Sequence, residues 1–381
     1  MTEQELYIHI PFCARRCAYC DFLSSTGPEL VRRAYGKALT AELDAIGQTN
    51  PAPLRSVFWG GGTPSLLTPA EFSEIAAAVE RNFTLCPSAE YTIEANPGTI
   101  TEEKMAAWKA AGVNRISMGV QSLEDARLQD IGRIHTARQA KEQFAALRAY
   151  GFRNLSMDLM MGLPGQSLAQ WQATLRGAVT MEPEHLSCYS LILEEGTPLY
   201  QQYEKGELSL PDEEEERAMY HWTVSFLSEC GYRQYEISNF AKPGQESRHN
   251  QGYWDRVPYI GAGLGAASLA QVNGEEIRYK NTSDMEHYIK ESRWPDHIRE
   301  ERQKLTKQDR QEEFMFLGLR KTEGIEAARF CALFGQTPEE VYAKPLQEQL
   351  QNGLLKKTQT GYCLTSRGMD LANQVFAAFL Q

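Results

Sequence analysis

The chain has 381 residues, of which 42% are hydrophobic, enough for one large domain and a smaller one. Its 39 basic residues against 50 acidic ones give a net charge of −11, which argues against broad binding to a nucleic-acid backbone. We find no apolar run of ~18 residues, no signal-peptide pattern, and too few cysteines for a disulfide framework. We therefore expect a cytoplasmic globular protein without a membrane span.

Short β-rich segments alternate with longer amphipathic segments from residue 5 to about residue 240. Strands are predicted at 6–10, 56–60, 91–96, 115–122, 154–164 and 186–193, and helices between them include 101–111, 137–150 and 167–181. This repeated order predicts an α/β fold of parallel strands with right-handed crossovers. In barrels of this kind the chemistry gathers at the C-terminal ends of the strands.

The last third of the chain has a different pattern. After a predicted helix at 211–231, residues 296–381 contain 12 basic and 12 acidic residues and end in two short strands around a Thr-Gly turn and a helix. This ending resembles a winged helix, although its neutral charge does not favour DNA binding. We expect a core over 1–240, an extension over 241–295 and a smaller α+β, winged-helix-like domain over 296–381.

Three cysteines lie close together after the first predicted strand. Cys13, Cys17 and Cys20 have the spacing C-x3-C-x2-C in the segment YIHIPFCARRCAYCDF, and the next cysteine is Cys86. Complete zinc and iron–sulfur sites take four protein ligands, so three thiolates leave one metal vertex open. Soft thiolates favour zinc, copper(I) or iron–sulfur. Three unrelated buried cysteines are the alternative, but cysteines rarely crowd into one loop by chance.

Glycines and polar residues follow several of the other predicted strands. FWGGGTPS contains three consecutive glycines, which permit close backbone approach, although a simple tight turn would explain them as well. Glu94, Gln121 and Asp158 end strands, and Arg133 lies in GRIH. Each could be a structural contact on its own. Together they predict a pocket with both charge signs, fit for a zwitterionic, hydroxyl-bearing ligand such as an amino-acid nucleoside.

These motifs resemble a known family. The C-x3-C-x2-C loop followed by GGGTP resembles the radical S-adenosylmethionine superfamily. The order of the motifs also resembles the oxygen-independent coproporphyrinogen III oxidase branch of that superfamily; these motifs are YIHIPFC, FWGGGTPS, IEANPG, GVQS, GRIH and DLMMGLPGQ. The resemblance implies a partial (β/α)6-type barrel. It also implies a [4Fe-4S] cluster on three cysteines, with S-adenosylmethionine chelating the fourth iron, and an electron donor protein.

The resemblance assigns a role to each matching position. Cys13, Cys17 and Cys20 would hold the cluster. The residues expected to contact S-adenosylmethionine are Tyr7, Gly61, Gly62, Thr63, Glu94, Gln121, Arg133 and Asp158. Arg133 suits the methionine carboxylate, Glu94 an amino or hydroxyl group, and Gln121 and Asp158 the ribose. His9 and His135 lie beside these motifs, where a structural role is at least as plausible.

Two departures separate the chain from the true oxidases of this branch. Those oxidases have a further cysteine where this chain has Phe22, and they carry an N-terminal segment ahead of the position of Tyr7. Both features resemble the haem chaperones of the branch. RHNQGYW also matches their H-N-x-x-Y-W pattern, which implies that His249, with Tyr253 and Trp254, contacts haem. Imidazole is a common axial ligand of haem.

The leading hypothesis is a haem chaperone that binds haem as cargo and transfers it to an acceptor protein. The alternative is a radical S-adenosylmethionine oxidoreductase such as the coproporphyrinogen III oxidase itself, because the machinery for radical chemistry is complete. A third hypothesis, a tRNA-modifying radical enzyme, is weakened by the net charge of −11. Whether the chain is an enzyme, which protein accepts haem, and whether it forms a homodimer stay open at this point.

Overall fold

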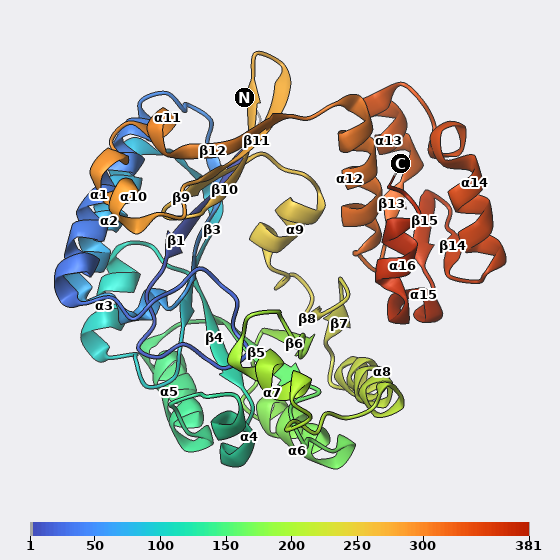
Figure 1. Cartoon of the computed structure of the whole chain (residues 1–381), viewed down its shortest axis with the longest axis horizontal. Coiled ribbons are helices and arrows are strands. Elements are labelled where there is room, and N and C mark those ends of the chain that lie inside the picture. Colours follow the sequence, from blue (N-terminus) through green and yellow to red (C-terminus); the bar gives the residue numbers. More distant parts are fainter. Residues whose placement is uncertain (1–2, 381) are drawn as a thin grey trace.

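The computed structural model describes residues 3–380 and has a 12-stranded sheet at its centre (Figure 1). Six parallel strands follow one another in chain order: β1 (Gln4–Ile10), β2 (Leu54–Gly61), β3 (Leu85–Ala95), β4 (Arg115–Gln121), β5 (Asn154–Met161) and β6 (His185–Ser190). Every residue of β4 is buried, as expected for a parallel strand covered on both faces. The predicted α/β class and its six strands are confirmed.

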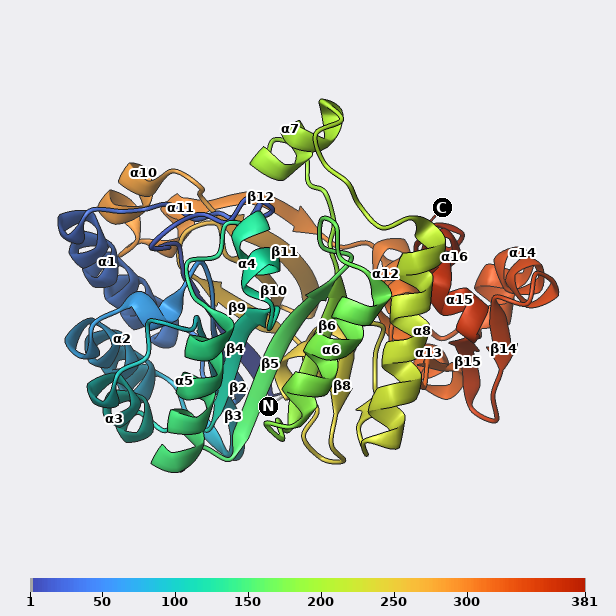
Figure 2. The same cartoon turned by 90° about the horizontal axis from the view of Figure 1, so that it is seen from below.

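Helices connect these strands and cover one face of the sheet (Figure 2). They are α1 (Glu29–Gly47), α2 (Pro69–Asn82), α3 (Glu102–Ala110), α4 (Asp125–Asp130), α5 (Ala137–Tyr150) and α6 (Leu168–Val179), with a short 3-10 turn, η1 (Pro64–Leu66). Helices α2, α5 and α6 each begin at a capping box, which satisfies backbone donors of the first turn. The parallel strand ends therefore share one edge, beyond which the connecting loops meet.

Shorter strands extend the sheet on both sides. Beyond β1 lie β9 (Tyr259–Ala262), β10 (Ala267–Val272), β11 (Glu275–Asn281) and β12 (Arg299–Lys304); beyond β6 lie β8 (Asn239–Ala241) and β7 (Arg233–Gln234). The charged sequence of β12 suits an exposed edge strand, because edge charges oppose pairing with other chains. The sheet thus continues past residue 296, and the domain boundaries expected from the sequence stay predictions.

The C-terminal residues form a second unit with its own hydrophobic core. Its elements are α12 (Lys307–Leu319), β13 (Ile325–Glu326), α13 (Ala327–Phe334), α14 (Pro338–Gln351), β14 (Leu355–Lys357), β15 (Gly361–Leu364), α15 (Ser366–Asp370) and α16 (Ala372–Ala377). The strands pair in the order β13-β15-β14, and Phe314, Phe330 and Tyr342 lie in the core. Helices followed by a hairpin match the winged-helix-like pattern expected for this region.

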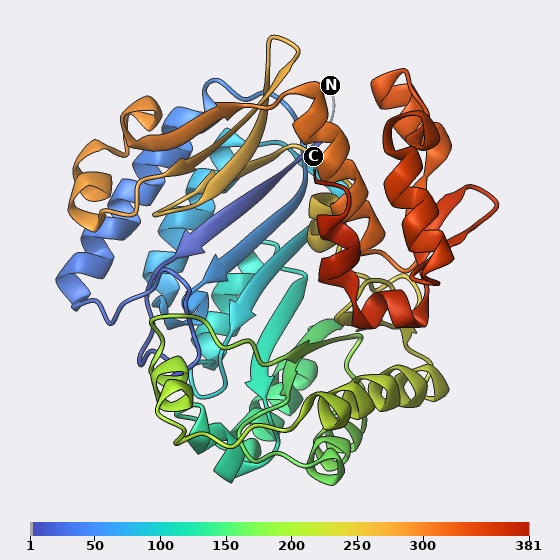
Figure 3. The same ribbon diagram turned by 45° about the vertical axis from the view of Figure 1, so that its right-hand side comes forward.

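The remaining helices are α7 (Pro198–Glu204), α8 (Glu213–Glu229), α9 (Arg248–Trp254), α10 (Met285–Glu291) and α11 (Pro295–Ile298). Helix α9 lies between the sheet and the C-terminal unit (Figure 1), and Figure 3 shows the C-terminal helices facing the open side of the sheet. Among residues 3–380, no helix combines the length and apolar character needed to cross a membrane.

Candidate cofactor site

The three clustered cysteines lie in the loop between β1 and α1 and line one large cavity, of about 950 Å³. The ends of this loop are held together, because the Cys13 amide donates to the Ser25 carbonyl over 3.0 Å. Phe12 is buried beneath the loop with its ring 5.3 Å from that of Tyr35. All three thiols are free and half-buried, and burial raises the pKa of Cys20. The loop therefore presents three reduced sulfurs to one space.

A chain of hydrogen bonds connects two of these sulfurs. The Thr63 hydroxyl lies 3.6 Å from Cys13 Sγ and accepts from Asn96 Nδ2 over 2.9 Å. Arg133 Nη2 donates to Asn96 Oδ1 over 2.7 Å, and its Nη1 lies 3.6 Å from Cys17 Sγ. Donors facing sulfur stabilise thiolates, and such hydrogen bonds tune iron–sulfur clusters. Asn96 was not among the expected site residues, although it lies in the IEANPG motif.

The cysteines fit a cluster better than a single ion. Across residues 3–380, no three His, Cys, Asp or Glu side chains already converge on one ion-sized point. In a four-iron cluster each cysteine would bind a different iron, so the three thiolates would lie around the cluster and not at one point. Three free cysteines on one cavity wall, with donors behind two of them, agree with that arrangement and with an iron left for another ligand.

The glycine turn packs directly against the cysteine loop. Gly61 has a φ of +106°, and a Cβ atom there would lie 2.5 Å from the His9 ring. A Cβ atom at Gly62 would lie 2.7 Å from the Phe12 carbonyl oxygen, and the Gly62 amide donates to the Ile10 carbonyl over 2.9 Å. Both glycines line the cavity with Thr63. Only residues without a side chain allow this close approach of backbone to the cavity.

Gln121 carries the signs of a ligand-facing residue. It lies at the end of β4 with a φ of 65°, a left-handed conformation unusual for a residue other than glycine. Its buried side-chain oxygen has no hydrogen-bond partner among the described residues. Such strain and unsatisfied polarity each cost on the order of 1–3 kcal/mol and cluster at functional sites. A ligand hydroxyl in the cavity would satisfy this oxygen.

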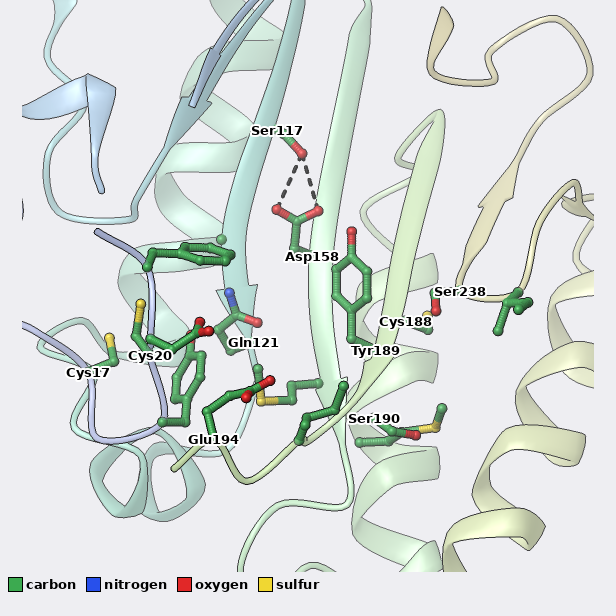
Figure 4. Close-up of a pocket in the computed structure, with 18 of the residues that line it drawn as sticks. Cys17, Cys20, Ser117, Gln121, Asp158, Cys188, Tyr189, Ser190, Glu194 and Ser238 are labelled. Carbon is green, nitrogen blue, oxygen red and sulfur yellow. Dashed lines mark hydrogen bonds between the residues drawn. The ribbon is translucent and has the colours of Figure 1, made fainter. Parts of the chain in front are cut away.

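Asp158 lies within β5, three residues before Met161 ends that strand and not at its end as the sequence predicted, and its carboxylate faces Ser117 (Figure 4). Its carboxylate oxygens accept from the Ser117 hydroxyl at 3.2 and 3.3 Å. Burial raises the pKa of Asp158, while hydrogen bonds and the Arg115 and Arg133 guanidinium groups oppose that rise. The cavity therefore brings together Cys13, Cys17, Cys20, Gly61, Gly62, Thr63, Glu94, Gln121, Arg133 and Asp158, ten of the residues proposed from sequence.

Glu94 is the second acid of the parallel strands that line the cavity, and it is half-buried. It ends β3, and its Oε2 accepts from the Gly61 amide over 3.2 Å. Burial and the neighbouring Asp158 raise the pKa of Glu94 from 4.5 to about 8. The folded chain thus holds a proton at Glu94 that the unfolded chain releases. The free energy of unfolding should therefore decrease, through this group, as pH rises from 4.5 to 8.

Glu94→Gln tests this effect because glutamine does not titrate. We expect the melting temperature of the variant to rise relative to that of the unchanged chain between pH 4.5 and pH 8, measured by circular dichroism. Glu102→Gln, in the exposed first turn of α3, is the control for loss of a carboxylate. A constant difference in melting temperature between Glu94→Gln and the unchanged chain would contradict the expectation.

Tyr7, His9 and His135 are not among the residues that line the cavity. The Tyr7 hydroxyl is 3.0 Å from His9 Nδ1, and the Tyr7 ring lies beside that of Phe58. His9 Nε2 is 2.9 Å from the Leu23 carbonyl, and His135 Nε2 is 3.1 Å from the Val120 carbonyl. Tyr7 is not among the cavity-lining residues, so a contact between Tyr7 and the adenosyl group stays a prediction.

His249 lies apart from the cavity, in helix α9, and is fully buried. Its Nδ1 is 2.8 Å from the Ser56 hydroxyl and its Nε2 is 3.1 Å from the Tyr253 hydroxyl. Its ring stacks on Phe58 with centroids 4.9 Å apart, and burial lowers the pKa of His249 to about 3. Neither ring nitrogen is open to a ligand in this arrangement. Haem contact at His249, Tyr253 and Trp254 stays a prediction.

The opposite wall of the cavity comes from parts of the chain for which the motifs gave no signal. Tyr189 belongs to β6 and Ile192 follows that strand, Arg217 and Tyr220 belong to α8, and Arg320 and 369–374 belong to the C-terminal unit. Phe22, at the position that distinguishes this chain from the oxidases, is 61% exposed and also lines the cavity. The cavity is therefore shared by the sheet and the C-terminal unit.

The fold and this site define a radical SAM protein. Residues 7–178 match the family model described as Radical SAM superfamily, and residues 305–371 match the HemN C-terminal domain. The chain belongs to the HemW family. It is 39% identical to the heme chaperone HemW of Bacillus subtilis, over 98% of both chains, and 33% identical to that of Escherichia coli, over 98% of this chain and 97% of that one.

A solved structure shows the same fold. Coproporphyrinogen III oxidase (HemN) from Escherichia coli, described as a radical SAM enzyme, superposes with a TM-score of 0.86 over 100% of this chain and 90% of that chain. The two sequences are 22% identical, so the likeness concerns the fold.

Proposed function

We propose that this chain is a cytoplasmic haem chaperone that binds haem as cargo and transfers it to an acceptor protein. The observation that carries the proposal is the likeness to curated heme chaperones along nearly the whole chain, at 39% identity over 98% of its length. The exposed Phe22 in place of a further cysteine supports the same reading. The acceptor protein, an electron donor protein and a homodimer belong to this proposal.

The chain's own residues fit the two supporting cofactors. Cys13, Cys17 and Cys20 would hold a [4Fe-4S] cluster, which supplies an electron to S-adenosylmethionine bound beside it. Arg133 would pair with the ligand carboxylate, because a guanidinium matches a carboxylate through two parallel hydrogen bonds. Gln121 and Asp158 would take the ribose hydroxyls, and Glu94 the amino group. In this proposal the cofactors support or regulate haem handling.

Haem titration of the anaerobically reconstituted chain tests the proposal. We expect a saturable change in the haem absorbance spectrum that ends at a single haem per chain. The control is the same titration of an unrelated protein of similar size without a haem site, which reports non-specific association of haem. Absorbance that rises without saturation, as in the control, would contradict a specific haem site.

The second candidate function is that of a radical SAM oxidoreductase such as an oxygen-independent coproporphyrinogen III oxidase. The observation that favours it is the complete set of strand-end residues around the cysteines. An assay for decarboxylation of coproporphyrinogen III, with reductant and S-adenosylmethionine, distinguishes the two functions, and we expect no product.

A further inference from the structure

We propose that Arg320 binds a carboxylate of the haem cargo inside the cavity, and that Trp254 affects haem binding by holding Arg320 in place. This inference rests on the proposed function, since it takes haem as the ligand. It assigns the binding of haem to the wall of the cavity formed by the C-terminal unit. Trp254 is then a positioning residue that does not need to touch haem.

Arg320 is fixed at the cavity wall from two sides. It caps the C-terminal end of helix α12 and lines the cavity. Its guanidinium carbon lies 4.5 Å from the centre of the Trp254 ring, and its Nη2 lies 3.5 Å from Glu236 Oε2. Its Nε is buried without a hydrogen-bond partner among the described residues. The guanidinium is therefore held in position while part of its hydrogen-bonding capacity is unused.

Glu236 orients Arg320 but is already engaged elsewhere. It is fully buried, and its Oε1 accepts from the Ser238 amide over 2.7 Å and from Asn239 Nδ2 over 2.6 Å. The contact to Arg320, through the other oxygen, is at the outer limit of a hydrogen bond. A guanidinium presents five donors in a planar fork that matches a carboxylate. Arg320 can thus donate hydrogen bonds to an anionic group in the cavity while it keeps its contact with Glu236.

The surroundings of Arg320 match a flat apolar molecule with acidic groups. Ile237, Met369 and Leu371 line the same cavity and provide apolar surface. The acids that line it are Asp21, Glu94, Asp158, Glu194, Glu213, Glu216 and Asp370. The ionised acids among them repel the propionates of haem, so the cavity arginines decide where a propionate can lie. Arg15, Arg16 and Arg217 also line the cavity but are exposed, and Arg133 is bonded to Asn96 and faces Cys17, whereas Arg320 is held in place by Trp254 and Glu236.

This arrangement gives the H-N-x-x-Y-W segment a role while its histidine stays buried. His249 fastens one end of α9 to strand β2 through Ser56. At the other end, Trp254 lies under Arg320, and Asp255 accepts from Lys321 over 2.7 Å and from Arg329 over 2.8 Å. Helix α9 thus sets the position of the C-terminal unit, and of Arg320, relative to the sheet. Substitutions in the segment would change haem binding through that position.

The test compares haem with haem dimethyl ester, in which both propionates are blocked. We expect Arg320→Met to weaken haem binding about tenfold or more, the loss typical of a hydrogen bond to a charged group, and to leave ester binding unchanged. Trp254→Leu, which removes the ring and keeps apolar bulk, should show the same selectivity. The double variant should bind haem no more weakly than Arg320→Met alone. Lys321→Met is the matched control, because it loosens the same interface without removing a cavity residue.

Each alternative outcome has a separate meaning. Equal weakening of haem and ester by Arg320→Met, or no weakening of haem, would overturn the assignment of Arg320. Additive effects of the two substitutions would overturn the positioning role of Trp254. If Lys321→Met weakened haem binding as much as Trp254→Leu, the positioning role of Trp254 would also be overturned. A loosened interface would then explain the effects of both substitutions. Failure of the unchanged chain to bind haem would instead reject the proposed function. Cluster content and circular dichroism are measured for every variant to confirm folding.

Discussion

Cys17→Ala is expected to yield a chain without the broad visible absorbance of an iron–sulfur cluster after anaerobic reconstitution. Cys17 Sγ lies 3.6 Å from the half-buried Arg133 guanidinium, which would stabilise the thiolate, and alanine provides no ligand for the iron. With two cysteines left, the loop cannot hold a cluster that needs three. Iron and acid-labile sulfide analysis, together with the absorbance spectrum, measures the loss.

The control for this experiment is Cys331→Ala, which removes an exposed thiol from helix α13, in the C-terminal unit away from the cavity. It should reconstitute like the unchanged chain. Retention of four irons and four sulfides by Cys17→Ala would refute the assignment of the cysteine loop as the cluster site.

Arg133→Met is expected to weaken S-adenosylmethionine binding by about tenfold to a hundredfold, because a buried charged hydrogen bond to the ligand carboxylate is lost. The substitution also removes the donor to Asn96 Oδ1. Isothermal titration with S-adenosylmethionine, on preparations matched for iron content, measures the affinity.

Two further variants isolate the contribution of the ligand contact. Arg133→Lys keeps the charge and loses the two-pronged geometry. Its affinity for S-adenosylmethionine should therefore lie between those of Arg133→Met and the unchanged chain. Arg138→Met removes an exposed arginine that pairs with Glu142 on helix α5 and should change nothing. Unchanged affinity in Arg133→Met with a normal cluster would place the ligand carboxylate elsewhere.

Much of the fold was predictable because the central parallel strands are largely buried. Such strands appear as short apolar runs, and the helices between them are amphipathic, so the parallel order followed from the pattern. Strand β12 was harder to predict, because its sequence REERQK has the composition of a solvated loop. It is a strand because β11 offers it an open edge, which no local pattern reveals.

The cysteine half of the site was predictable for the same topological reason. Parallel strands end at one edge, so polar residues predicted at the ends of three strands were expected to meet. Glu94, Gln121 and Asp158 do line one cavity, although Asp158 lies three residues before the end of β5. Asn96 escaped attention because an asparagine before a proline is also typical of a turn. Its side chain matters because it joins Thr63 and Arg133.

The far wall of the cavity could not be predicted from the sequence. Arg320 and Met369 reach the cavity because the C-terminal unit packs beside the sheet, and no local pattern encodes that contact. The burial of His249 was equally hidden. The sequence pattern of a histidine among aromatic residues is the same whether the histidine faces a ligand or packs in the core. Here the His249 ring packs against Phe58.

Haem binding and coproporphyrinogen III turnover, measured on one reconstituted preparation, test the central claim most directly. The account predicts saturable binding of a single haem per chain, recovered unchanged, and no decarboxylated product in the presence of reductant and S-adenosylmethionine. Conversion of coproporphyrinogen III to protoporphyrinogen, with no saturable binding of haem, would contradict it.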